Sequence, residues 1–315
     1  MSIHLTSHTI IDRERVNLIA RVHSLIQHGI QPRLDVVMVG DDPKSRLYVD
    51  KIKRQQAEDL GIIFRSHHFN QDASPDRIKE IILSLNQNPD CHAIIIQLPL
   101  PESLDTETIL NLVKPQKDVD GLTAQSPFTP PTVLSIMQLL SEYEITLTNQ
   151  KIGIVGQGRL VGLPLANTLR RLGLKPELFD EANFNPNSLR ELDVIISATG
   201  QPGLIQGQYL KPEVIALDAD RDLDWPTVEP IARAITPSQG AIGPLTVFFL
   251  LENTVLAAEE QAANGTLSPV LSPVSALPVV TDESGLAINH YQDASGAAIY
   301  QTSQTLDQDL IEDAE

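Results

Sequence analysis

A tyrosine and two lysines in the segment YVDKIK, residues 48–53, are the first candidates for chemistry in this chain. Tyr48 offers an aromatic face for stacking. A lysine whose pKa is lowered by burial can accept and return a proton near neutral pH. On a regular helix, Lys51 lies about 60° around the axis from Tyr48 and Lys53 about 140° away. The segment therefore predicts either a catalytic lysine beside the tyrosine or two solvated lysines on a helix surface.

A glycine-rich segment, VGQGRLVGLP at residues 155–164, is the second candidate. It follows an apolar run and opens a helical pattern. Gly156, Gly158 and Gly162 permit a tight turn and a close approach of the backbone to a diphosphate, while the helix N-terminus supplies N–H donors. The last gap is one residue longer than in G-x-G-x-x-G, so the turn taken alone could be purely structural.

A second small-residue loop strengthens the prediction of a dinucleotide site. It comprises residues 197–200, including Thr199 and Gly200, and lies at the carboxyl end of the strand predicted at residues 193–199. Ligands gather at the carboxyl ends of parallel strands, so two such loops predict a shared cofactor site.

Strand and helix patterns alternate along the chain, which predicts an α/β fold with parallel sheets. The predicted strands are residues 35–40, 62–69, 93–97, 151–156, 177–179, 193–199 and 214–218. The predicted helices are residues 44–60, 75–86, 103–113, 130–144, 162–172 and 244–259.

Composition limits the class of protein. The 315 residues suffice for two domains, and a single cysteine, Cys91, excludes an internal disulfide, as expected for a cytoplasmic protein. A signal-peptide pattern and a run of about 18 apolar residues are both lacking, so we expect no membrane association. The net charge of −18 disfavours nucleic acid as a partner. The eight histidines form no spaced ligand set, so we expect no metal.

The C-terminal region differs from the rest of the chain. The last basic residue is Arg233, and the 82 residues after it carry 11 acids. Residues 261–315 are rich in Ser, Pro, Ala and Gln and lack periodicity, which predicts an acidic and mostly disordered tail.

Eight motifs, in one order, resemble those of the bifunctional methylenetetrahydrofolate dehydrogenase/cyclohydrolase family. They are GDDP with a following Ser and Tyr (40–48), QLPLP (97–101), KDVDG (117–121), TP (129–130), the glycine-rich segment (155–164), SATGQPG (197–203), TP (236–237) and GPLT with LENT (243–254). The resemblance implies a two-domain α/β fold. A folate-binding domain of residues 1–130 would be completed by the helix at 244–259, and a Rossmann-like NAD(P)-binding domain would occupy residues 131–243.

The resemblance also implies residue roles. Family members oxidise 5,10-methylenetetrahydrofolate with a nicotinamide and hydrolyse the methenyl product to 10-formyltetrahydrofolate. Their tyrosine stacks on the aminobenzoate ring, here Tyr48, and the QLPLP glutamine, here Gln97, hydrogen-bonds the catalytic lysine. Their second DVDG aspartate, here Asp120, binds the pterin. Gly243 and Pro244 would join the substrate site. Without the resemblance, Asp120 could be a turn residue and Gln97 a strand-end cap.

The catalytic lysine is not fixed by simple alignment. The family places it four residues after the tyrosine, where this chain has Ile52. When the alignment is counted back from the glycine that ends the helix, Lys53 occupies the position of the catalytic lysine. When it is counted forward from Tyr48, Lys51 lies nearest to the tyrosine around the helix axis. A π-bulge near Asp50 would absorb the extra residue and turn Lys53 toward the tyrosine, so we favour Lys53 and keep Lys51 as the alternative.

Cofactor choice stays open between NADP and NAD. Family members usually carry Arg-Ser after the first turn glycine, and that arginine binds the 2′-phosphate of NADP. This chain has Gln157 and Gly158 there, although Arg159 could reach a phosphate. Asp180, at the end of the second strand of the unit, favours a free ribose 2′-hydroxyl.

Other departures concern the nicotinamide edge. The loop between Gly121 and Thr129 is shorter than in the family, ADRD follows Asp218 in place of a Gly-Ile/Val-Asn stretch, and TPSQGA at 236–241 replaces Pro-Gly-Gly. Our leading hypothesis is a bifunctional homodimeric enzyme. The alternatives are a dehydrogenase without hydrolase activity and a noncatalytic folate- or nucleotide-binding relative.

Overall fold

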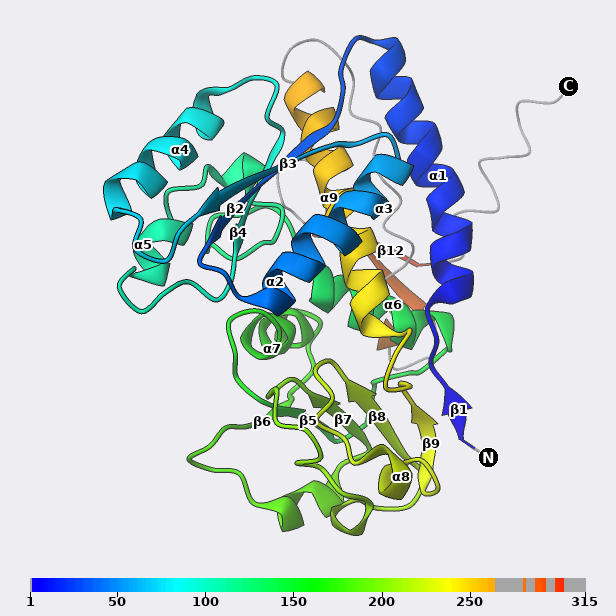
Figure 1. Ribbon diagram of the computed structural model, residues 1–315. Coiled ribbons are helices and arrows are strands. Elements are labelled where there is room, and N and C mark those ends of the chain that lie inside the picture. The colour runs from blue at the N-terminus through cyan, green and yellow to red at the C-terminus, as the bar shows by residue number, and fades with distance from the viewer. Residues whose placement is uncertain (1, 264–279, 282–286, 293–297, 303–315) are drawn as a thin grey trace, which may run out of the picture. The chain divides into compact units, whose positions relative to one another are not determined.

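The computed structural model describes residues 2–263 and three short strands in the C-terminal region, residues 280–281, 287–292 and 298–302 (Figure 1). The chain divides into two compact units. The N-terminal unit comprises Thr9–Pro131 and Pro244–Ser272, and the central unit comprises Met1–His8, Thr132–Gly243 and Pro273–Glu315.

The first eight residues correct the predicted domain boundary. The sequence assigned residues 1–130 to one domain, whereas Met1–His8 belongs to the central unit. The reason is backbone pairing, because β1 (Ile3–His4) lies parallel to β9 (Ala232–Ile235). A two-residue strand that pairs with a partner this distant in sequence leaves no local pattern.

The N-terminal unit is built on a parallel sheet of order β3-β2-β4. Its strands are β2 (Arg33–Val39), β3 (Ile63–Phe69) and β4 (Ala93–Gln97), and β2 is buried along its length. The helices of this unit are α1 (His8–Gln27), α2 (Pro43–Leu47), α3 (Arg54–Asp59), α4 (Pro75–Gln87), α5 (Thr106–Leu110) and α9 (Ile242–Ala263). Apolar side chains of α4 pack with β2 and β4 in one buried cluster.

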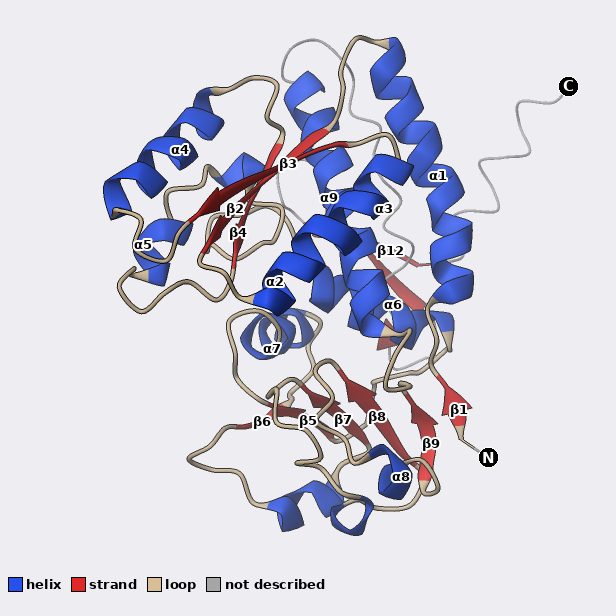
Figure 2. Cartoon of the chain, in the orientation of Figure 1, coloured by secondary structure: helices blue, strands red, loops and turns tan. Residues whose placement is uncertain are grey.

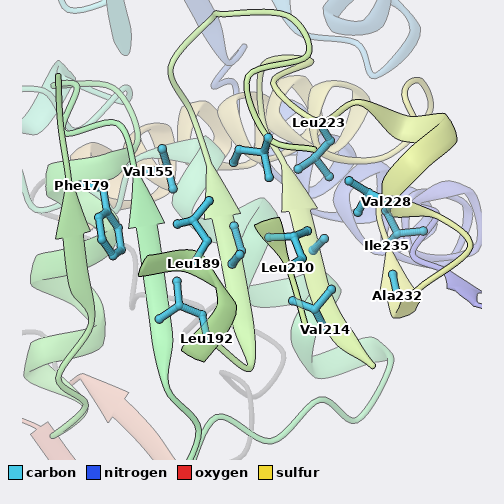
Figure 3. Packing of buried hydrophobic residues seen from close by; sticks show 13 residues of the cluster. Val155, Phe179, Leu189, Leu192, Leu210, Val214, Leu223, Val228, Ala232 and Ile235 are labelled. Atoms are coloured by element: carbon cyan, nitrogen blue, oxygen red, sulfur yellow. The ribbon is translucent and has the colours of Figure 1, made fainter. Parts of the chain in front are cut away.

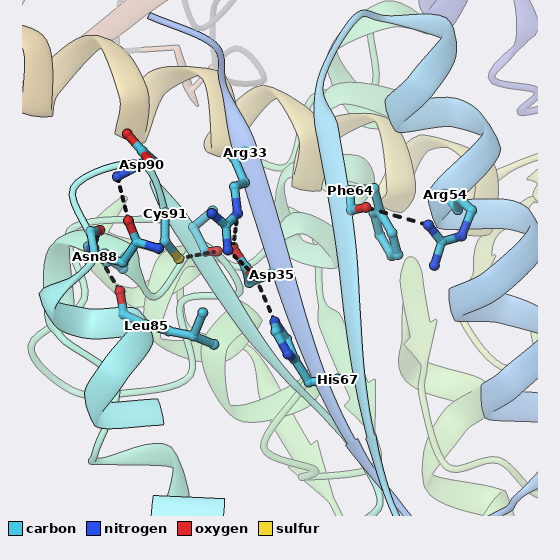
Figure 4. Close-up of polar contacts among 11 residues, drawn as sticks. Arg33, Asp35, Arg54, Phe64, His67, Leu85, Asn88, Asp90 and Cys91 are labelled. Atoms are coloured by element: carbon cyan, nitrogen blue, oxygen red, sulfur yellow. Dashed lines mark hydrogen bonds and ion pairs between the residues drawn. The ribbon is translucent and has the colours of Figure 1, made fainter. Parts of the chain in front are cut away.

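Asp35, on β2, is the centre of a buried polar network (Figure 4). Its carboxylate pairs with Arg33, the two atoms Arg33 Nε and Asp35 Oδ2 being 2.7 Å apart, and Asp35 Oδ1 lies 2.7 Å from Nε2 of His67. These contacts lower the pKa of Asp35 against the opposing effect of its burial. His67 thus takes part in this polar network. Within the described part of the chain, no group of three or more His, Cys, Asp or Glu could hold a metal ion.

The central unit carries a six-stranded parallel sheet of order β1-β9-β8-β7-β5-β6, with strands drawn red in Figure 2. The remaining strands are β5 (Ile152–Val155), β6 (Glu177–Phe179), β7 (Val194–Ser197) and β8 (Val214–Asp218). The helices are α6 (Pro131–Glu142), α7 (Gly162–Arg171) and α8 (Trp225–Val228). Buried hydrophobic residues, among them Leu192 and Leu210, pack in one cluster against the sheet (Figure 3).

The C-terminal region contains structure that the sequence did not predict. Strands β10 (Val280–Thr281), β11 (Ala287–Gln292) and β12 (Ala298–Thr302) form an antiparallel sheet, and α9 extends to Ala263. The sequence predicts disorder for residues 261–315. Apart from the end of α9 and these three strands, that segment lies outside the described residues.

Helix α9 is the one described helix whose length and apolar composition would allow it to cross a membrane. Of its most apolar window, 72% is buried inside the protein. That burial is typical of a core helix, so the helix is weak evidence for a membrane span.

Candidate active site

The YVDKIK segment forms a π-helix, Tyr48–Lys53, inserted between α2 and α3. The predicted π-bulge is therefore confirmed. At its end, the backbone N–H of Arg54 donates to the carbonyl of Val49, five residues back. The wider turn accommodates one extra residue and changes the angular relation of every side chain after it.

This distortion brings Lys53 to the tyrosine. Lys53 Nζ lies 5.3 Å from the centroid of the Tyr48 ring, within cation–π distance. Lys53 is only 6% exposed, whereas Lys51 is exposed to solvent. Of the two candidate lysines, only Lys53 joins the predicted site.

Gln97 orients the Lys53 ammonium from the neighbouring sheet. It ends β4, and its Oε1 accepts a hydrogen bond of 3.0 Å from Lys53 Nζ. Its amide nitrogen donates to the carbonyl of Leu98 at 2.8 Å. Because the amide nitrogen is engaged by a backbone acceptor, the side-chain oxygen is the atom that faces the lysine.

Asp120 is set by a constrained turn. Gly121 adopts a φ of +66°, and a Cβ there would lie 2.5 Å from the carbonyl oxygen of Phe128. The carboxylate of Asp118 accepts hydrogen bonds from the backbone N–H and hydroxyl of Thr123 at 2.9 and 2.8 Å. Asn253, on α9, donates to the carbonyl of Val119 at 2.9 Å. Asp118 and Asn253 thus fix the backbone on either side of Asp120, and sequence reasoning missed both.

Charge couples Lys53, Asp120 and Tyr48. Burial lowers the pKa of Lys53, and the charge of Asp120 opposes that shift. Burial likewise raises the pKa of Asp120, with Lys53 opposing and Asp118 adding to the rise. Burial and then Asp120 raise the pKa of Tyr48 to about 12, so the phenol stays neutral. A buried lysine with a lowered pKa can serve as general acid and base.

The glycine-rich turn leaves β5 at the point where the order of the central sheet reverses, since β5 has β6 on one side and β7 on the other. A Cβ on Gly156 would lie 2.4 Å from the carbonyl oxygen of Ala198, and one on Gly162 would lie 1.8 Å from that of Gly156. A Cβ on Gly158 would meet no atom within 4 Å. Gly156 and Gly162 are therefore required by close backbone packing, and Gly158 leaves open space at the sheet edge where a diphosphate would bind.

The loop after β7 is held by a carboxylate that sequence reasoning missed. Asp222 is fully buried. It accepts hydrogen bonds from the Ser197 hydroxyl at 2.6 Å, from the Thr199 N–H at 2.6 Å and from the Gln201 N–H at 2.9 Å. Gly200, between the last two donors, has a φ of +70°. The ADRD departure noted in the sequence thus ends in the residue that shapes this loop, and only its place after a strand end signals it.

Comparison with known proteins gives two consecutive matches. Residues 5–120 match the tetrahydrofolate dehydrogenase/cyclohydrolase catalytic domain, and residues 130–262 match the NAD(P)-binding domain of the same family. The chain belongs to this family.

Relatives cover most of both chains. The bifunctional protein FolD of Bordetella bronchiseptica is 34% identical over 271 residues, covering 80% of this chain and 95% of its own. The crystal structure of the bifunctional enzyme FolD from Campylobacter jejuni superposes with a TM-score of 0.79 at 30% identity, covering 83% of this chain and all of that one. The Trypanosoma brucei dehydrogenase-cyclohydrolase, solved with NADP cofactor and inhibitor, gives a TM-score of 0.78 at 25% identity, with 83% and 98% coverage.

The two regions that match the family hold the predicted site residues in two groups. Tyr48, Lys53, Gln97 and Asp120 lie in the N-terminal unit and Lys51 faces solvent, as described above. The cofactor candidates lie around the carboxyl ends of β5, β6 and β7 in the central unit; they are Gly156, Gln157, Gly158, Arg159, Gly162, Asp180, Thr199 and Gly200. Gly243 and Pro244 form the first turn of α9, Gly243 being exposed and Pro244 half-buried.

Proposed function

We propose that this protein oxidises 5,10-methylenetetrahydrofolate to 5,10-methenyltetrahydrofolate with NAD(P)+ and hydrolyses the product to 10-formyltetrahydrofolate. The observation that carries the proposal is the hydrogen bond of 3.0 Å from the buried Lys53 to Gln97, beside the ring of Tyr48. Membership of the family and the bifunctional relatives support the same reaction pair.

Substrate binding is assigned to Tyr48 and Asp120. The neutral phenol ring of Tyr48 offers a stacking face for the aminobenzoate ring. The carboxylate of Asp120 is the natural acceptor for the paired N–H donors of a pterin edge. With Asp120 fixed by its turn, the one-carbon unit is brought to Lys53.

Hydrolysis is assigned to Lys53. Its neutral amine takes a proton from water as the water oxygen bonds to the methenyl carbon. The bond from that carbon to N5 then breaks as N5 receives a proton from the lysine. The carbonyl of the formyl group forms with loss of the second water proton, so one proton is released per turnover. Gln97 holds the amine in place through both transfers.

Hydride transfer needs less from the protein. The two nitrogens that flank the methylene carbon stabilise the cation that remains, so no basic side chain is required. The nicotinamide supplies the hydride acceptor when it is bound. The glycine turn and the loop fastened by Asp222 would hold the dinucleotide, and the Cβ contacts described above fit that role.

The dehydrogenase-only alternative depended on a displaced lysine, and the π-helix removes its motivation. We also propose that the protein is a cytoplasmic homodimer without nucleic-acid or membrane partners. The single cysteine supports a cytoplasmic location, and the net charge of −18 argues against nucleic acid as a partner. The dimer is proposed from the family resemblance, and light scattering on the purified protein tests it.

Matched lysine variants test the proposed function. Lys53→Ala is expected to slow methenyl hydrolysis by ~10²–10⁴-fold, the usual contribution of a general acid–base group, while hydride transfer persists. Lys51→Ala removes an exposed lysine from the same helix and should leave both rates near wild type. Absorbance of the methenyl product reports its formation and decay. A wild-type protein that forms no methenyl product with either nucleotide would overturn the proposal.

A further inference from the structure

Asp180 is fixed at the carboxyl end of β6, next to the glycine turn. Its Oδ1 accepts hydrogen bonds from the backbone N–H groups of Ala182 at 3.0 Å and Asn183 at 3.1 Å. Its own N–H donates to Oδ1 of Asn183 at 2.7 Å. The carboxylate is half-buried, and its direction is set before any ligand arrives.

Gln157 supplies the remaining contact from across the turn. Its Nε2 donates to Oδ2 of Asp180 at 2.8 Å. Gln157 directly follows Gly156, so its side chain leaves the start of the glycine turn. Here that position carries a neutral amide, which donates its hydrogen bond to a carboxylate.

The charge at this corner of the site therefore favours a hydroxyl-bearing ligand. Gln157, Ala182 and Asn183 are neutral donors, so they orient the negative charge of Asp180 without cancelling it. A ribose with a free 2′-hydroxyl offers an O–H donor to such a carboxylate. A ribose 2′-phosphate carries about −1.5 to −2 charges at neutral pH and would be repelled.

We propose that Asp180, held in place by Gln157, makes the central unit select NAD over NADP. The inference rests on the proposed dehydrogenase function and names its cofactor. Two negative groups about 4 Å apart in a partly solvated site repel strongly enough to give at least a roughly tenfold preference for NAD.

Direct binding is the first test, because it does not depend on turnover. Isothermal titration calorimetry of the full chain with NAD+ and with NADP+ is expected to give a dissociation constant at least about tenfold lower for NAD+. Asp180→Asn keeps the shape of the side chain and removes its charge, so the ratio of the dissociation constant for NADP+ to that for NAD+ should fall toward one. Glu181→Gln removes an equal charge from the exposed neighbouring residue and should leave the ratio unchanged.

A second variant keeps Asp180 and neutralises its field. Gln157→Arg places a cation against the carboxylate, and it should reduce the preference for NAD even if Asp180→Asn does not fold. Circular dichroism checks the fold of each variant. Combining Gln157→Arg with Asp180→Asn should favour NADP.

The outcomes separate this inference from the proposed function. Equal or tighter binding of NADP+ by wild type, binding of neither nucleotide, or an unchanged ratio in folded Asp180→Asn overturns the role of Asp180. Selective NAD+ binding without methenyl formation would uphold Asp180 and overturn the dehydrogenase function. Methenyl formation that favours NADP+ would uphold the dehydrogenase function and overturn the role of Asp180.

Discussion

Individual charges set the pH range of the proposed hydrolysis. Lys53 acts as a base in its neutral form, so the rate should rise with pH through the pKa of this lysine. Burial lowers that pKa, and Asp120 raises it. Asp120→Asn removes the charge that raises the pKa of Lys53, so the rising limb of the pH–rate profile should move to lower pH. The measurement is kcat for methenyl hydrolysis at saturating substrate, corrected for the uncatalysed rate. Glu58→Gln, an exposed carboxylate change on α3, should leave the limb in place. A limb that stays or moves upward in Asp120→Asn would contradict this coupling.

A substitution at Asp222 should impair the dehydrogenase reaction and leave the hydrolysis intact. Asp222→Asn replaces a carboxylate acceptor with an amide that presents N–H groups to donors at Ser197 and Thr199. Losing hydrogen bonds to a charged acceptor costs about 1.5–3 kcal/mol, so the KM for the dinucleotide should rise by about tenfold or more. Hydrolysis of added methenyltetrahydrofolate uses Lys53 and should be unchanged. A uniform loss of both activities would mean that Asp222 only supports folding.

At the scale of elements, the sequence predicts what is local. Strands β2, β4, β5 and β8 are each built around a short apolar run and lie close to their expected bounds. The π-helix was predicted from the one extra residue between Tyr48 and the glycine that ends the helix. Helix α1 was not predicted, because its apolar residues occur on more than one face and Val16 is 69% exposed. The predicted helix at 103–113 is shorter, with α5 capped at its start by the Asp105 side chain, which accepts from Thr108.

The π-helix itself can be tested by deletion. Removing Ile52, which is 39% exposed, leaves Lys53 four residues after Tyr48 and lets the helix run as a regular α-helix. Lysine and tyrosine then share a face, so hydrolysis should stay within roughly tenfold of wild type, against the ~100-fold loss expected from a misplacement of about 1 Å. The matched control is deletion of exposed Gln55, which rotates the buried Ala57 and Leu60 out of the core and should lower the melting temperature. Loss of hydrolysis in the Ile52 deletion as large as that in Lys53→Ala would show that the bulge does more than restore register.

The whole molecule depends on contacts between distant parts of the chain, which local patterns do not encode. Helix α9 belongs to the N-terminal unit although more than a hundred residues of the central unit precede it. Its Asn253 binds the carbonyls of Val119 and Thr129, and its Glu252 and Glu259 pair with Arg21 on α1 at 3.0 and 2.7 Å. The GP-x-T start and the apolar composition predict the helix, whereas these partners become visible only in the fold.

Truncation at two points tests this division of the chain. A variant that ends at Ala263 keeps all residues that match the family and every site residue named above, so its melting temperature and both activities should stay close to wild type. A variant that ends at Gly243 loses α9. Its buried Leu251 and Val255 alone each contribute ~1.5–3 kcal/mol, and the missing Asn253 leaves Val119 without its partner next to Asp120. Because domains are stable by only ~5–15 kcal/mol, the N-terminal unit should unfold and hydrolysis should be lost. Thermal unfolding with methenyl hydrolysis measures both effects, and a shorter variant that still hydrolyses the substrate would show that α9 is dispensable for the site around Lys53.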